Sequence, residues 1–170
     1  MKILVTGGAG FIASHVADAF IEDKHDVVIL DDLSTGFEKN VNSKAKFVKM
    51  NICDKEIARL FEEEKFDAVN HHAAQMDVRR SVKDPAFDAT TNILGTINLL
   101  QNSVKYGVKK FIFASTGGAV YGEQEYFPAD EKHPMNPLSP YGLSKLRNRQ
   151  TNTRLCFCER RCKSKSSDIE

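Results

Sequence analysis

The segment MKILVTGGAGFIAS, residues 1–14, begins with a short apolar run and continues into closely spaced glycines. Residues 3–5 are Ile, Leu and Val, which is typical of a buried strand. The glycines fit two spacings of the dinucleotide-binding pattern, Gly8-x-Gly10-x-x-Ala13 and Gly7-x-x-Gly10-x-x-Ala13. A strand, a tight turn and a helix in this order bring backbone N–H groups close to a pyrophosphate. A glycine pattern alone is weak evidence, and the alternative is an ordinary strand–turn–helix corner.

The composition indicates a protein of one domain, or of one domain and part of another, because the chain has 170 residues, 41% of them hydrophobic. A net charge of +1 argues against a nucleic-acid partner and against an anionic membrane surface. We expect neither a signal peptide nor a membrane span. Four cysteines then favour the reducing cytoplasm. Cys156, Cys158 and Cys162 do not have a usual zinc spacing, so we expect no metal site.

Strand-like and helix-like segments alternate along the chain and predict a doubly wound α/β fold with a parallel sheet. Further strands are predicted at residues 27–30, 46–49, 67–71 and 111–115. Helices are predicted at residues 11–22, after a cap at Asp54, from Pro85 to Gly107, and from Ser139-Pro140 onward. The expected inward-facing residues of the first helix are Phe11, Ile12, Val16, Ala19 and Phe20. Those of the helix after Asp54 are Ile57, Leu60 and Phe61, and the apolar positions of the long helix are Phe87, Ile93, Leu94, Ile97, Leu99, Leu100 and Val104.

Polar and small residues follow the second and fourth predicted strands, where ligands bind in such sheets. Asp31 and Asp32 come about 20 residues after the glycines, a position from which a carboxylate can bind ribose hydroxyls and repel a 2′-phosphate, which favours NAD over NADP. The alternative is a turn cap. His71 and His72 are neighbours in a strand, so their side chains point to opposite faces, and we expect both to be structural.

Hydroxyl side chains follow the fifth predicted strand, and a tyrosine and a lysine four residues apart begin the next helix. Ser115 and Thr116 are placed for ligand contact or for simple capping. Tyr141 and Lys145 lie on one helix face, where the ammonium favours the phenolate and lowers the tyrosine pKa. A tyrosine tuned in this way can act as a base near neutral pH.

Taken together, these motifs resemble the extended short-chain dehydrogenases/reductases of the NAD-dependent epimerase/dehydratase family, and within it the UDP-glucose 4-epimerases. The matching segments cover residues 1–146 in order: TGGAGFIASH, DDLSTG, HHAAQ, SVKDPAFDATTNILGTINLL, FIFASTGGAVYG and SPYGLSK. The resemblance implies an incomplete Rossmann-like NAD-binding domain over residues 1–146, with the family's substrate domain missing.

The resemblance also assigns roles to residues. Tyr141 would be the catalytic acid/base, Lys145 would hold the cofactor ribose, and Thr116, or next Ser115, would bind the sugar hydroxyl. Residues expected along the cofactor are Gly7, Gly10, Phe11 and Ile12 at the pyrophosphate, Asp31, Asp32, Ser34, Thr35 and Gly36 at the adenosine ribose, Asn51 and Ile52 near the adenine, and Ala73, Ala74, Gln75 and Asn92 along the rest.

The implied reaction is the interconversion of UDP-glucose and UDP-galactose by transient oxidation at sugar C4. Gly117-Gly118 stands where dehydratases of the group carry Asp-Glu, which favours epimerisation. A truncated NAD-binding module without catalysis, and another nucleotide-sugar epimerase or reductase, remain as alternatives. The implied partner is a UDP-hexose. Relatives pair through two helices, so the resemblance allows a homodimer formed through the long helix at Leu99.

The family pattern ends at Leu146, and residues 147–170 form a basic, cysteine-rich tail. A frameshift in the coding sequence is one hypothesis for this tail, and a genuine C-terminus is the other. We expect the missing sixth strand to leave a sheet edge and apolar helix faces uncovered, which favours aggregation. We also expect little epimerase activity from the chain as written.

Overall fold

The computed structural model describes residues 1–130 and 132–148, and its centre is one parallel sheet of five strands in the order β3-β2-β1-β4-β5. The strands are β1 (Lys2–Thr6), β2 (Asp26–Asp31), β3 (Lys46–Lys49), β4 (Ala68–His71) and β5 (Lys110–Phe113). The chain starts in the middle, moves out to β3, and returns to the other side of β1 at β4. This order confirms the predicted doubly wound parallel sheet and creates a topological switch point between β1 and β4.

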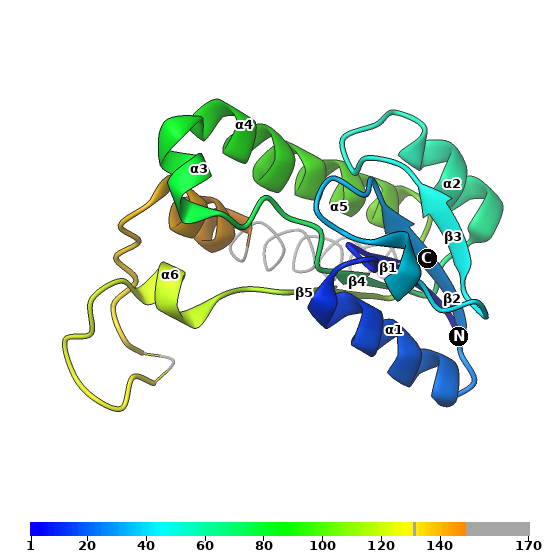
Figure 1. The fold of residues 1–170 in the computed structure, drawn as a ribbon, viewed down its shortest axis with the longest axis horizontal. Coiled ribbons are helices and arrows are strands. Elements are labelled where there is room, and N and C mark those ends of the chain that lie inside the picture. The colour runs from blue at the N-terminus through cyan, green and yellow to red at the C-terminus, as the bar shows by residue number, and fades with distance from the viewer. Residues whose placement is uncertain (131, 149–170) are drawn as a thin grey trace, which may run out of the picture.

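Helices cover both faces of the sheet (Figure 1). On one face lies α1 (Phe11–Glu22), and on the other lie α2 (Ile57–Glu64) and α5 (Gly95–Lys105). The shorter elements are η1 (Glu38–Asn40), α3 (Val78–Lys83), α4 (Pro85–Ala89), the π-helical turn η2 (Thr90–Leu94) and α6 (Gly117–Tyr121). Residues 140–148 are also helical, as predicted.

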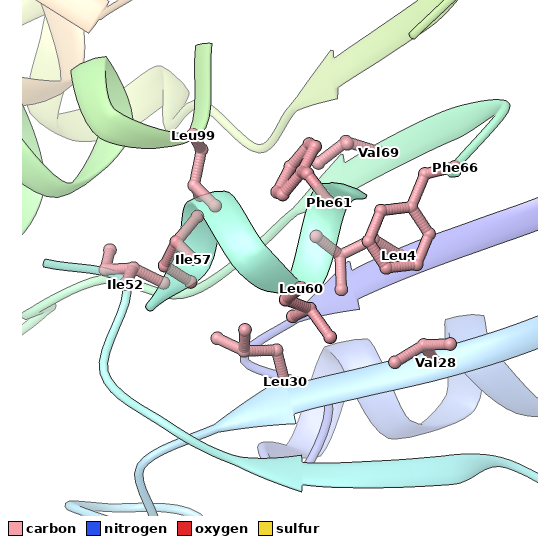
Figure 2. Packing of buried hydrophobic residues seen from close by; sticks show 10 residues of the cluster. All are labelled: Leu4, Val28, Leu30, Ile52, Ile57, Leu60, Phe61, Phe66, Val69 and Leu99. Carbon is pink, nitrogen blue, oxygen red and sulfur yellow. The ribbon is translucent and has the colours of Figure 1, made fainter. Parts of the chain in front are cut away.

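Alternation along the strands divides the core into two clusters. Leu4 packs with α2 and α5 in the cluster of Figure 2, whereas Ile3 and Val5 pack with α1. The predicted inward face of α2 is confirmed, because Ile57, Leu60 and Phe61 all lie in the cluster of Figure 2. Each such side chain stabilises the fold by about 1.5–3 kcal/mol relative to an exposed position.

The prediction for the inward face of α1 was wrong for Phe11, Ile12 and Ala19, which are exposed, whereas Phe20 is partly buried and packs against the core. The buried residues of this helix are Ala13, Ser14 and Ala17, while Phe11 is 80% exposed and Ile12 is 66% exposed. Small residues face the sheet because α1 packs closely against it behind the glycine turn. The larger apolar side chains instead line a shallow surface groove of about 490 Å³.

The predicted long helix is divided into α4, η2 and α5. Leu99 and Leu100 are buried as expected, but Phe87, Leu94 and Val104 are exposed. A π-helical turn holds one residue more than an α-helical turn, so the apolar face shifts around the axis at η2. Because Leu99 is fully buried, it is not available for pairing with a second copy.

Two boundaries also differ from the prediction. Strand β5 ends at Phe113 instead of Ser115. Helix α2 begins at Ile57, and Asp54 does not cap it, because the Asp54 carboxylate accepts a hydrogen bond from Asn51 N at 3.0 Å. None of the helices in residues 1–130 and 132–148 is both long and apolar enough to cross a membrane.

Glu64 links α2 to the sheet, and replacing it with glutamine is expected to destabilise the protein. Its carboxylate is 8% exposed and pairs with Lys2 of β1 and Lys46 of β3. Their hydrogen bonds, that of Lys2 first, lower the Glu64 pKa. We expect Glu64→Gln to cost about 1–3 kcal/mol at pH 7, measured by urea unfolding.

The matched control is Glu63→Gln, which removes an exposed pair with Arg59 and should cost below about 1 kcal/mol. Because folding lowers the Glu64 pKa, its contribution is complete above the ordinary value of 4.5 and declines as the pH falls through the folded pKa. Equal costs for the two variants, or a Glu64 effect that grows in acid, would contradict this assignment.

Candidate functional site

The glycine loop lies at the carboxyl end of β1. Gly7 has φ +71°, and a Cβ there would lie 2.7 Å from Ala73 N, so only glycine lets the loop approach the end of β4. Gly10 precedes α1 and has no side chain to cap the helix. The first N–H groups of α1 are therefore placed to meet an anion, and Phe11 and Ile12 stand at the same helix end.

The carboxylate of Asp31 ties this loop to the end of β2. Its Oδ2 accepts from Ala9 N at 3.0 Å, and its Oδ1 accepts from Leu33 N at 2.8 Å. Asp32 accepts from Ser34 N at 2.8 Å and from Asn51 Nδ2 at 2.7 Å. A carboxylate has about four acceptor positions, so both can still accept from ribose hydroxyls.

The structure brings only some of the other residues predicted near the adenosine to the carboxyl end of β2. Ser34 and Thr35 are exposed, and Gly36 lies against Ala9, where a Cβ would be 2.8 Å from the alanine Cβ. Asn51 accepts from Cys53 N at 2.9 Å through its side-chain oxygen. The side chain of Ile52 is buried in the core cluster of Figure 2, so it is turned away from the loop.

Residues after β4 form the next side of the site. Ala73 N donates to Thr6 Oγ1 at 3.2 Å, and Ala74 is partly buried beside it. Gln75 is held in place, because its N donates to Asn92 Oδ1 at 2.8 Å and its Nε2 donates to Asp88 Oδ1 at 3.0 Å. These contacts fix the backbone past which an extended ligand would run.

His71 is structural, as predicted, and is fully enclosed between β1 and α5. Burial, and then the charge of Lys145, lowers the His71 pKa to about 3, so its imidazole is neutral. His72 is half-buried, and the same two causes lower its pKa. Among the described residues, no group of three or more His, Cys, Asp or Glu side chains is arranged to hold a metal ion.

Tyr141 and Lys145 lie on one face of the helix formed by residues 140–148. Lys145 is 4% exposed, and its Nζ donates to Ala114 O at 3.1 Å just beyond β5. The Nζ lies 4.8 Å from the ring centroid of Phe113 and 5.9 Å from that of Tyr141. The ammonium thus stands close to the tyrosine at the carboxyl edge of the sheet.

The expected lowering of the Tyr141 pKa was wrong for this structure. Burial, and then the negative charge of Asp88, raises the Tyr141 pKa above its ordinary value of 10. Burial also lowers the Lys145 pKa to about 8, against the opposing effect of Asp88. The spacing of tyrosine and lysine gave no sign of the buried carboxylate, which comes from another helix.

Thr116 lies between β5 and α6 and makes no side-chain capping bond to α6, so its hydroxyl can meet a ligand. Ser115 beside it is exposed. Helix α6 packs tightly on the tyrosine helix, since a Cβ at Gly142 would lie 2.3 Å from Ala119 O. This contact brings the hydroxyl segment and Tyr141 to the same side of the sheet.

Asn92 lies behind these residues in η2 and is 2% exposed. Its Nδ2 donates to Gln75 O at 2.9 Å, to Asp88 Oδ1 at 3.0 Å and to Ser144 Oγ at 3.3 Å. The amide is therefore occupied inside the protein, and contact with a cofactor stays a prediction.

Sequence reasoning missed the residues that support the site from behind, which are Thr6, Asp88, Thr96, Ser144 and Asn148. A signal for two of these residues, Asp88 and Thr96, was present in the sequence. Asp88, Asn92 and Thr96 are spaced by four and form a polar stripe within an otherwise apolar helix pattern.

Comparison with known proteins agrees with this geometry. The model of the NAD dependent epimerase/dehydratase family matches residues 3–156. A putative UDP-glucose 4-epimerase of Methanocaldococcus jannaschii is 55% identical over 143 residues, which are 84% of this chain and 47% of that protein. The UDP-glucose 4-epimerase of Mycolicibacterium smegmatis is 45% identical over 86% of this chain and 48% of its own.

Two solved structures superpose well on the chain. The UDP-glucose 4-epimerase of Thermotoga maritima, solved with UDP-glucose, has a TM-score of 0.89 and 48% identity, over 91% of this chain and 51% of that one. The UDP-glucose 4-epimerase of Thermus thermophilus, solved with NAD, has a TM-score of 0.87 and 44% identity, over 90% of this chain and 50% of that one. This chain thus spans about half the length of the relatives it matches, and it belongs to the NAD dependent epimerase/dehydratase family.

Proposed function

We propose that this chain is the NAD-binding half of a nucleotide-sugar 4-epimerase acting on UDP-glucose and UDP-galactose. The observation that carries the proposal is the convergence of the Gly7 loop, the Asp31 carboxylate and the Tyr141–Lys145 pair at one edge of the sheet. The uncapped start of α1 fits a pyrophosphate, and the carboxylates after β2 fit a ribose without a 2′-phosphate.

Bound NAD would supply hydride acceptance at sugar C4 and return the hydride to the opposite face. The residues of this chain would position the reactants and move the proton. Tyr141 Oη would exchange a proton with the sugar 4-hydroxyl, and Thr116 or Ser115 would orient that hydroxyl. Lys145 would hold the ribose hydroxyls, because its ammonium can donate hydrogen bonds to their oxygens.

A binding experiment tests this proposal. We expect the 170-residue chain to bind NADH at least about tenfold more tightly than NADPH, a difference of about 1.4 kcal/mol, because Asp31 and Asp32 repel a 2′-phosphate. Fluorescence titration with both nucleotides measures the ratio. Equal affinities would contradict the role of the two carboxylates, and absence of NADH binding would contradict the proposal.

The same sample separates the catalytic interpretation from a binding module. The relatives are about twice as long, and by resemblance the uridine-nucleotide site belongs to their other half. We therefore expect NADH binding without conversion of UDP-galactose. Turnover near the rate of a full-length relative would contradict the fragment interpretation, and use of a different nucleotide sugar would favour another epimerase or reductase.

Two further points belong to the proposal. The composition of residues 147–170, which lie almost entirely outside the described residues, supports a frameshift, and sequencing the coding DNA from Ser139 onward tests it. A homodimer is supported by exposed apolar side chains, among them Leu138 and Leu143. These side chains lie beside a cleft of about 460 Å³ between α4 and residues 137–144.

A further inference from the structure

A continuous series of buried side-chain hydrogen bonds runs from the end of β1 to the π-helical turn. Thr6 Oγ1 accepts from Ala73 N at 3.2 Å and lies 2.7 Å from His71 Nδ1. His71 Nε2 lies 2.9 Å from Thr96 Oγ1, which donates to Asn92 O at 2.5 Å. Within this series, His71 joins the strand β1 to the helix α5, because its two ring nitrogens are paired with Thr6 and Thr96.

The chemistry of these groups allows the hydrogen bonds of the series to be donated in only one direction. A carbonyl can only accept, so the Thr96 hydroxyl proton points to Asn92 O, and Thr96 can only accept from His71. The His71 proton must therefore sit on Nε2. A neutral ring then accepts at Nδ1 from the Thr6 hydroxyl, and Thr6 in turn accepts from Ala73 N. Every donor and acceptor is satisfied by one tautomer.

The series ends on the helix that carries Tyr141 and Lys145. The Asn92 carbonyl also accepts from Asn148 Nδ2 at 2.7 Å, and the Asn92 side chain donates to Ser144 Oγ at 3.3 Å. Ser144 and Asn148 are four residues apart on that helix, on either side of Lys145 in the sequence. Asn92 thus holds the helix at two points one turn apart.

His71 also supports Lys145 through its backbone. Ala114 N donates to His71 O at 3.0 Å, and the carbonyl of the same Ala114 accepts the Lys145 ammonium at 3.1 Å. The lysine is therefore connected to His71 by two independent routes, one through Thr96 and Asn92 and one through Ala114.

We propose that His71 is a positioning residue for the candidate site: as a neutral imidazole it joins the strand behind the glycine loop to the turn of Asn92, and so sets the position of the Tyr141–Lys145 helix. The functional importance of this role for His71 rests on the proposed function. The structural link between His71 and the helix of Tyr141 and Lys145 rests only on the observed hydrogen bonds.

Thr96 offers the sharpest test. Thr96→Val removes the hydroxyl and keeps the shape, whereas Thr96→Ser keeps the hydroxyl. The matched control is Ser103→Ala, since Ser103 Oγ is buried in the same helix and donates to Leu99 O at 2.7 Å, four residues back. Asp88, whose charge opposes the lowering of the Lys145 pKa, and His72, whose own pKa the Lys145 charge lowers, are unchanged in all three variants.

The readouts are the pKa of Lys145 and the affinity for NADH, both measured on the 170-residue chain. Lys145 is followed by nitrogen NMR and assigned with Lys145→Met. We expect Thr96→Val to raise the Lys145 pKa from about 8 toward its ordinary 10.5, because the loosened helix admits water, and to weaken NADH binding at least about tenfold. Thr96→Ser should restore both values, and Ser103→Ala should change neither.

An unchanged Lys145 pKa in Thr96→Val, or an equal shift in Ser103→Ala, would overturn the proposal. So would a His71 ring that NMR shows protonated at Nδ1 and not at Nε2. If the unaltered chain fails to bind NADH, the proposed function fails, while the comparison of Lys145 pKa values still decides the role of His71.

Discussion

Replacing Gly7 with alanine is expected to cost about 3 kcal/mol or more of unfolding free energy and to abolish measurable NADH binding. Gly7 has φ +71°, where an alanine is strained by about 1–2 kcal/mol. The new Cβ would also lie 2.7 Å from Ala73 N and 2.9 Å from Ala73 Cα, and both atoms are backbone. Pushing them away costs about 1–3 kcal/mol more. It also moves Ala73 from Thr6, to which it is hydrogen-bonded.

Gly107 provides the matched control for this experiment. It has nearly the same backbone conformation, with φ +72°, but a Cβ there would meet nothing within 4 Å. Gly107→Ala therefore carries the strain without the collision, and we expect a cost of about 1 kcal/mol with unchanged NADH affinity. Urea unfolding and NADH titration of both variants measure the difference. Equal costs would show that the glycine loop does not approach β4 as closely as the structure has it.

The strands of this fold could be predicted from the sequence because buried parallel strands read as short apolar runs. The strand predicted at residues 3–5 lies within one residue of β1 at both ends, and the strand predicted at residues 46–49 has the same bounds as β3. The helix faces were harder. Pattern reasoning assigns the largest apolar side chains to the core, but α1 presents Ala13 and Ala17 to the sheet because the tight glycine turn brings it close.

The acid/base pair could be located from the sequence, whereas its electrostatics could not. Tyr141 and Lys145 are four residues apart on one helix, so their proximity follows from helix geometry. The pKa of each group depends on burial and on Asp88, which reaches the site from a distant segment. Only the folded arrangement of α4 against residues 140–148 brings that carboxylate near.

Asn92→Asp is expected to cost about 3–5 kcal/mol at pH 7, because it places a second carboxylate beside a buried one. Asp88 is 1% exposed, and its Oδ1 accepts from both Gln75 Nε2 and Asn92 Nδ2. The substitution removes one of these donors and leaves Gln75 O without its amide partner. Asparagine and aspartate have the same shape, so the change is electrostatic and leaves no cavity.

The pH dependence of this variant has a definite sign. Burial and the neighbouring Asp88 raise the folded-state pKa of the introduced carboxyl above its unfolded value of about 3.9. The folded variant therefore binds more protons than the unfolded variant, and its stability recovers as the pH falls from 7 toward about 4. A single proton shared by the two carboxyl groups removes most of the repulsion.

Asn102→Asp separates this effect from the loss of an amide in general. Asn102 is buried in α5 and donates to Asn98 O and Asn98 Oδ1, with no carboxylate among these partners. We expect it to cost about 1–2 kcal/mol, with a weaker recovery in acid. Urea unfolding of both variants between pH 4 and pH 8 gives the comparison. A cost for Asn92→Asp that equals the control at every pH would contradict the close contact between residue 92 and the Asp88 carboxyl group.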